Sequence, residues 1–184
     1  FIPAAIAGMA GFSVAGLFTS MVPSIMRQVM GQSDGVVIGA VVGSFFAASV
    51  VGQAALQWIP ARSHMSTGCA GLILGMVTLG LSISTEQLGL LMIAGALAGI
   101  GQGMVFRAGM GAVTAASPAH HKAAVSSALF VVFYFSMSLP VIAVGVSVPV
   151  FGLRHVGELF SAIVAVVAVL AMLSMKRAQA VSAA

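Results

Sequence analysis

Six long runs of apolar residues follow one another along the chain, and short polar segments separate them. An α-helix needs about 20 such residues to cross the hydrocarbon core of a bilayer. The runs extend approximately over residues 2–30, 35–58, 65–83, 88–116, 118–146 and 156–175. The pattern therefore predicts an all-α membrane protein, in which residues 1–184 form a single bundle of six transmembrane helices.

The polar segments between the runs carry residues that begin helices. Serine, threonine and aspartate accept hydrogen bonds from the first free backbone N–H groups of a helix. Ser33 or Asp34 is expected to cap the second helix in this way, and Ser84 or Thr85 the fourth. Ser117 is expected to cap the fifth helix, because a proline follows it directly. These segments are short, so the sequence predicts no folded domain outside the membrane.

The composition excludes a soluble domain. Of the 184 residues, 60% are hydrophobic and only 5% are charged, whereas soluble domains carry roughly a quarter of charged residues. The mean hydropathy is +1.17. The formal net charge of +4 arises from few residues that flank apolar runs. The lipid bilayer, and not nucleic acid, is therefore the expected partner.

Cysteine and histidine provide no metal or redox chemistry in this sequence. The single cysteine, Cys69, lies within an apolar run and has no partner for an internal disulfide. No Cys/His spacing typical of a metal site occurs, and we expect neither a metal nor a cofactor. The chain begins at Phe1 without a charged segment before a short apolar stretch. We therefore expect a piece of a longer protein and no secretory signal.

The charged residues are distributed unequally between the two sides of the membrane. With six spans both termini lie on one side, and that side carries five basic residues: Arg62, Arg107, Lys122, Lys176 and Arg177. The opposite side carries two basic residues and all three acidic ones: Arg27, Arg154, Asp34, Glu86 and Glu158. Loops rich in lysine and arginine stay in the cytoplasm. We therefore expect a multi-pass protein of the cell (inner) membrane with both termini cytoplasmic.

Small residues recur at intervals of four in two of the predicted helices. Such rows let helices approach closely in a bilayer, where van der Waals packing drives helix association. The rows consist of Gly35, Gly39 and Gly43 in the second helix and of Gly95, Gly99 and Gly103 in the fourth. We interpret them as helix-packing positions. Sliding of helices during a conformational change is a second interpretation, compatible with the first.

Polar and aromatic side chains within the spans are the candidates for a substrate cavity, because polar groups are costly in lipid. The candidates are Ser20, Arg27, Gln53, Gln102, Phe130 and Tyr134. The structural alternative is a hydrogen bond between helices or to the residue's own helix. For Arg27 the alternative is a side chain that reaches the headgroups. No aspartate or glutamate lies in mid-membrane, so a proton-coupling carboxylate is not expected in this chain.

An enzymatic function is not expected. Ser13 in the segment GFSVAG would need a histidine at membrane depth to act as a nucleophile. The four histidines stand at the ends of the predicted spans: His64, His120, His121 and His155. The same placement argues against haem ligation inside the bundle.

Three segments resemble the C-terminal six helices of the major facilitator superfamily, in particular of its bacterial efflux members. They are GFSVAGLFTSMVPSIMRQVMG, GVVIGAVVGSFFAASVVGQ and AGIGQGMVFRAGMGAVTAASPAHHKAAVSSALFVVFYFSMSLPVIAVGV. The resemblance implies one half of a twelve-helix transporter, whose N-terminal six-helix half is a partner missing from this chain. It also implies that the first and fourth helices line a central cavity, and that the second and fifth face the other half.

The function expected from this resemblance is secondary active transport of a small-molecule substrate by alternating access, with efflux favoured. Uptake of a nutrient by a carrier of the same fold is one alternative. A self-contained six-helix membrane protein that forms a homodimer, or a channel, is another.

Overall fold

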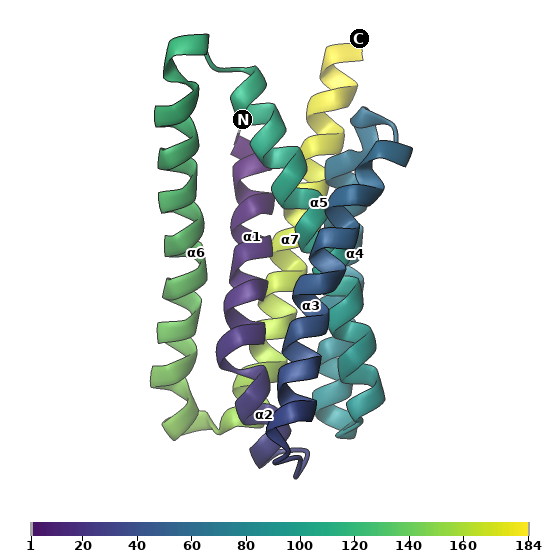
Figure 1. The fold of residues 1–184 in the computed structure, drawn as a ribbon, viewed down its shortest axis with the longest axis vertical. Helices are drawn as coiled ribbons and strands as arrows, with labels where there is room; N and C mark the ends of the chain where they lie inside the picture. Colours follow the sequence, from purple (N-terminus) through teal and green to yellow (C-terminus); the bar gives the residue numbers. More distant parts are fainter. Residues whose placement is uncertain (1, 184) are drawn as a thin grey trace.

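A computed structural model describes the backbone of residues 2–183 and the side chains of residues 6–118 and 120–174. The helices are α1 (Ile2–Ser20), α2 (Val22–Gln28), α3 (Gly35–Ala55), α4 (His64–Thr85), α5 (Leu88–Ala115), α6 (Lys122–Phe151) and α7 (Leu153–Ala183). Single turns of 3-10 helix lie in the connections: η1 (Leu56–Trp58), η2 (Ala61–Ser63) and η3 (Ala119–His121). The described residues form no β-strand, and the helices stand side by side as an up-and-down bundle (Figure 1).

Five helices of the described chain, α3 to α7, are long and apolar enough to cross a membrane. Helices α1 and α2 make a sixth span if they are taken together, although the chain bends by 40° between them. Pro23 stands at the start of α2 and provides no backbone N–H, so the hydrogen-bond ladder is interrupted at the bend. The predicted all-helical architecture is thus confirmed, with several helices long and apolar enough to span a membrane.

Asp34 caps α3, as the sequence predicts. Its carboxylate accepts hydrogen bonds from the backbone N–H groups of Val36 at 2.7 Å and Val37 at 3.4 Å. These N–H groups belong to the first helical turn and have no partner within the helix. Asp34 therefore defines where α3 begins, directly after the polar segment that follows α2.

The caps expected for the fourth and fifth spans are wrong. Ser84 and Thr85 belong to the last turn of α4, where their hydroxyls donate to carbonyl groups one turn earlier. Glu86 then adopts a left-handed backbone conformation, with φ of 57°, and ends the helix. Ser117 likewise donates to the carbonyl oxygen of Val113 and closes α5. Serine and threonine can bond to the preceding turn as well as cap the next one, and the sequence does not distinguish the two.

Helix α5 lies at the centre of the bundle and packs against α1, α3 and α4. Helix α1 also packs against α6 and α7, and α4 packs against α7. The main apolar core lies between these helices, with the rings of Phe18 and Phe45 stacked at 4.6 Å between centroids. Helices α3 and α6 flank α1 on opposite sides (Figure 1) and do not pack against each other. They are the least buried of the five spanning helices.

Helix α6 continues through two prolines, Pro140 and Pro149, and reaches Phe151, beyond its predicted end near residue 146. Because Pro140 provides no N–H, the carbonyl oxygen of Ser136 loses its usual helical partner. Ser13 of α1 donates its hydroxyl to that oxygen at 2.8 Å. Neighbouring helices commonly satisfy backbone groups that a proline frees inside a membrane. Here the replacement bond connects α1 to α6.

Charged residues lie at the two ends of the bundle. Helix α1 begins and helix α7 ends at the same end of the bundle (Figure 1). Near the opposite end, Arg154 pairs with Glu86 at 2.9 Å and with Glu158 at 3.5 Å. The first pair connects the end of α4 to the start of α7, and the second lies within the first turns of α7. The side chains of Lys176 and Arg177, expected near the termini, lie outside the described part of the chain.

Candidate functional site

One side of α1 and α5 is covered by α4 and α7, and the other side lies between the flanking helices α3 and α6. We call this second side the central face. Its polar and aromatic groups come from all four helices that border it.

Gln102 forms the best-defined polar contact of the central face. The hydroxyl of Ser49 on α3 donates to its side-chain oxygen at 2.6 Å, and both residues are more than nine-tenths buried. Gly11 of α1 lies against the Gln102 side chain, since a Cβ atom there would be 3.4 Å from its Cγ. The pair thus marks the point where α1, α3 and α5 meet. Such a bond stabilises a membrane bundle by about 0.6 kcal/mol and at most about 1.7 kcal/mol.

The amide nitrogen of Gln102 keeps two hydrogen-bond donors for another partner. No atom of the described chain accepts a hydrogen bond from it. Every fully enclosed side-chain nitrogen or oxygen among the described residues has a partner, so this nitrogen reaches the molecular surface. A free amide donor is costly against hydrocarbon. The surface at this junction is therefore suited to water, a polar ligand or another polypeptide, and not to lipid tails.

Four phenylalanines form an aromatic cluster beside this junction, one turn along α5. The rings of Phe12 and Phe133 stack at 4.4 Å between centroids, and Phe106 meets both edge-on at 5.7 and 6.0 Å. Phe130 completes the cluster at 6.3 Å from Phe106. Gly8 makes the stacking possible, because a Cβ atom there would be 2.6 Å from the Phe133 ring. The cluster is separate from the main core and joins α1, α5 and α6.

Phe130 and Tyr134 present exposed aromatic surface on α6. Phe130 is 37% exposed while its ring touches the cluster. Tyr134 is 63% exposed and stacks on no other ring of the described chain. The structure thus joins Phe130 to the aromatic cluster and leaves Tyr134 one turn further along α6, available to a partner or ligand.

The remaining cavity candidates do not join this group. Ser20 donates to the carbonyl oxygen of Gly16 in its own helix, and it lines a pocket between α1, α2 and α6. Arg27 is exposed on α2 and forms no ion pair with a described residue. Gln53 contributes only its backbone carbonyl, which accepts a hydrogen bond from Arg107 at 2.8 Å. The six candidates are therefore distributed along the bundle and do not form one compact site.

The glycine row of α5 lies at a backbone contact with α3. A Cβ atom at Gly99 would collide with the carbonyl oxygen of Phe45, and one at Gly103 with that of Ser49. At Gly95 the neighbour is the Phe18 ring of α1, at 3.1 Å. The absence of side chains in this row lets Ser49 come within hydrogen-bonding distance of Gln102.

The glycine row of α3 makes no contact of this kind. A Cβ atom at Gly35, Gly39 or Gly43 would meet nothing within 4 Å in the described chain. Their interpretation as packing positions therefore does not hold inside this bundle. The reason is that α5 contacts a different face of α3, the one that carries Ser49 and Gly52.

Four residues of the central face are absent from the candidates of the sequence: Ser49, Phe12, Phe106 and Phe133. Ser49 shares one face of its predicted helix with the candidate Gln53, and its contact with Gln102 distinguishes it from the other serines in apolar runs. Phe12 and Phe133 are apolar residues in apolar runs, so no sequence signal marks them. They become neighbours because α1 packs against α6.

No protein-family model matches the chain, and no curated protein matches it either. Membership of the major facilitator superfamily therefore stays a prediction from the sequence segments. Among the described residues, no group of three or more His, Cys, Asp or Glu side chains is placed to hold a metal ion. The central face offers the amide nitrogen of Gln102 and the rings of the aromatic cluster.

Proposed function

We propose that this chain is one six-helix half of a secondary transporter of the major facilitator type, which moves a small amphipathic molecule by alternating access. The observation that carries the proposal is the Gln102 amide, whose free donors reach the surface where α1, α3 and α5 meet. Inside a membrane such donors need a polar counterpart. A water-filled cavity that admits a substrate provides one.

The two flanking helices support a partner on the same face. Helices α3 and α6 are the least buried spans, and the α3 glycine row lies open. A second six-helix unit laid over them would close the central face into a cavity at the interface between the halves. The partner we propose is an N-terminal six-helix half. A second copy of this chain is the alternative, and it would offer the same open glycine row.

We propose that the end of the bundle at which α1 begins faces the cytoplasm, because most basic residues of the sequence belong to that side. Efflux is the direction we favour. The three acidic residues are all placed at helix ends: Asp34 caps α3, and Glu86 and Glu158 pair with Arg154. If transport is coupled to protons, the coupling carboxylate belongs to the other half.

Dye export from cells tests this proposal. Cells that produce the full-length protein are loaded with the uncharged amphipathic dye Nile red, washed and energised, and the loss of fluorescence is followed. We expect loss at least threefold faster than from cells with an empty vector, and an uncoupler should remove the difference. Equal dye loss with faster accumulation of a nutrient would replace efflux by uptake. No difference in either direction across a panel of solutes would contradict transport.

A further inference from the structure

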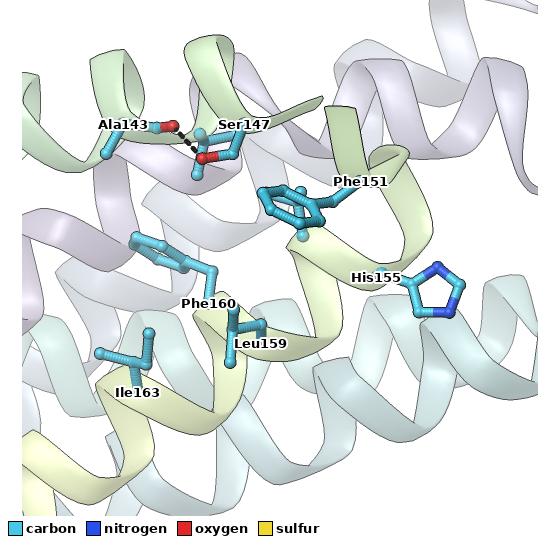
Figure 2. A pocket seen from close by; sticks show the side chains of 9 residues that line it. Ala143, Ser147, Phe151, His155, Leu159, Phe160 and Ile163 are labelled. Atoms are coloured by element: carbon cyan, nitrogen blue, oxygen red, sulfur yellow. Dashed lines mark hydrogen bonds between the residues drawn. The ribbon is translucent and has the colours of Figure 1, made fainter. Parts of the chain in front are cut away.

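An apolar groove of about 400 Å³ lies between α6 and α7 (Figure 2). Its lining includes Phe151, Phe160 and Ile163, and its few polar groups are at one end or turned away. The Ser147 hydroxyl donates to the carbonyl oxygen of Ala143 in its own helix at 2.8 Å, as the dashed line in Figure 2 shows. The groove therefore offers no free hydrogen-bond donor in mid-length, and an apolar body fits it.

A second pocket, of about 260 Å³, lies on the other side of α6, against α1 and α2. It is lined by Val141 and Gly145 of α6 and by polar side chains that include Ser24 and Gln28. Val141 and Gly145 follow Tyr134 by seven and eleven residues, so all three share one face of α6. This pocket, which we call the inner pocket, thus lies on the same side of α6 as Tyr134.

The groove and the inner pocket are separated by a closed constriction. Val144 lines the groove, the constriction and the inner pocket, and Phe160 lines the groove and the constriction. The constriction itself has no free volume for a water-sized group. Val144 and Phe160, packed with Leu17, Met21 and Pro140, therefore separate the groove from the inner pocket on the Tyr134 side.

The segment of α6 over the constriction is built to bend. Pro140 and Pro149 flank it, and each removes one backbone hydrogen bond from the helix. Gly145 in its middle has no neighbour within 4 Å of a Cβ position. Gly152, with φ of 80°, ends the helix in a conformation that favours glycine. Sharp bends in helices occur at such prolines, and contacts between α6 and α7 are sparse.

We infer that the α6–α7 groove is a lateral portal, through which an amphipathic substrate passes between the bilayer and the inner pocket when α6 bends. The inference rests on the proposed transport function and specifies its substrate class. The apolar groove accepts an alkyl or aromatic body. The hydroxyls of Ser20 and Ser24 and the amide of Gln28 accept a small uncharged polar group in the inner pocket. Val144 and Phe160 form the gate.

Photolabelling tests the portal without measuring transport. Membrane vesicles with the full-length protein are equilibrated with hexadecanol that carries a diazirine in mid-chain, irradiated, and analysed by peptide mass spectrometry. We expect labels in the groove, at Leu159 or Ile163, and in the inner pocket, at Ser24 or Gln28. Groove labelling should exceed labelling of Val166, an exposed residue of the same helix that lines neither pocket, at least threefold.

Two variants separate the gate from the groove. Val144→Phe should lower labelling of the inner pocket at least fivefold and leave groove labelling within twofold. The matched control is Val146→Phe, the same change at an exposed position of α6 that lines neither pocket. In this variant, labelling of the groove and of the inner pocket should equal that in the unmodified protein. Ala143→Phe lies on the exposed wall of the groove, where a larger side chain does not disturb the core. Ala143→Phe should therefore reduce labelling of the groove and of the inner pocket to the same extent.

Unchanged labelling of the inner pocket in Val144→Phe and Ala143→Phe would overturn the portal, because the probe would then arrive by another route. Groove labelling no stronger than that of Val166 would overturn it as well. If the two variants behave as expected and the protein nevertheless moves no solute, the passage stands and the proposed transport fails. The two proposals are therefore tested separately.

Discussion

Replacing Gly99 by valine is expected to lower the free energy of unfolding by about 3 kcal/mol. The added side chain would meet the carbonyl oxygen of Phe45 and would lie 3.0 Å from the Cβ atom of Ala48. The first of these neighbours is backbone, which cannot turn aside as a side chain can. Helices α3 and α5 would have to separate, and the Ser49–Gln102 bond would lengthen or break. Thermal unfolding of the purified protein should shift downward by roughly 10 °C.

The matched control is Gly43→Val, the same substitution in the parallel glycine row of α3. No described atom lies within 4 Å of a Cβ atom at Gly43, so the unfolding temperature of this bundle should stay within about 2 °C of the unmodified protein. If another six-helix unit covers α3, Gly43→Val should instead weaken its association with that unit. Equal losses of stability in the two variants would show that α3 and α5 do not pack as described.

Replacing Gln102 by alanine is expected to reduce dye export about fivefold, because the cavity would lose its amide donors at the junction of α1, α3 and α5. A neutral hydrogen bond contributes about 1 kcal/mol, and 1.4 kcal/mol corresponds to a factor of ten. The helix–helix bond lost with the side chain is weaker, about 0.6 kcal/mol, so the protein should still insert and fold. Transport rate and membrane content are measured in the same cells.

Two variants separate recognition from structure at this position. Ser49→Ala removes the same interhelical bond and leaves the amide in place, so we expect less than a threefold loss of export. Gln87→Ala removes an exposed amide at the start of α5 that caps no helix, and export should not change. If Ser49→Ala loses as much export as Gln102→Ala, the pair has a structural role and not a substrate-binding one.

The spanning helices were predictable because each needs a long apolar run, and the sequence contains six. Their ends were less predictable, since hydropathy detects only the apolar part of a helix. Helix α6 continues past residue 146 to Phe151, and α7 begins at Leu153 and extends to Ala183. Pro149 lies within α6 and does not end it, because neighbouring helices or water can satisfy the freed carbonyl group.

The contacts of the central face could be predicted only in part. Gln102 is detectable because a glutamine within a span requires a polar partner. The two glycine rows have the same four-residue spacing, yet only the row of α5 lies against a neighbour. Spacing defines a face of a helix, whereas the order in which helices pack decides whether that face is covered. The same order brings Phe12 against Phe133, although the two residues are far apart in the sequence.

The central claim is that the face between α3 and α6 encloses water in the assembled protein. It is tested by the reactivity of single cysteines toward a charged, membrane-impermeant maleimide, with the buried Cys69 replaced by alanine. Tyr134→Cys and Val166→Cys are compared because the two positions are similarly exposed in this chain, at 63% and 57%. Of these two positions, only Tyr134 lies on the central face, which we assign to a cavity.

In native membranes, Tyr134→Cys should react at least tenfold faster than Val166→Cys, because a thiol facing hydrocarbon is not reached by a charged reagent. Added Nile red should slow the reaction of Tyr134→Cys and leave that of Val166→Cys unchanged. Equally slow reaction at both positions would place Tyr134 in lipid. That result would contradict a water-filled central face and, with it, the transporter half proposed for this chain.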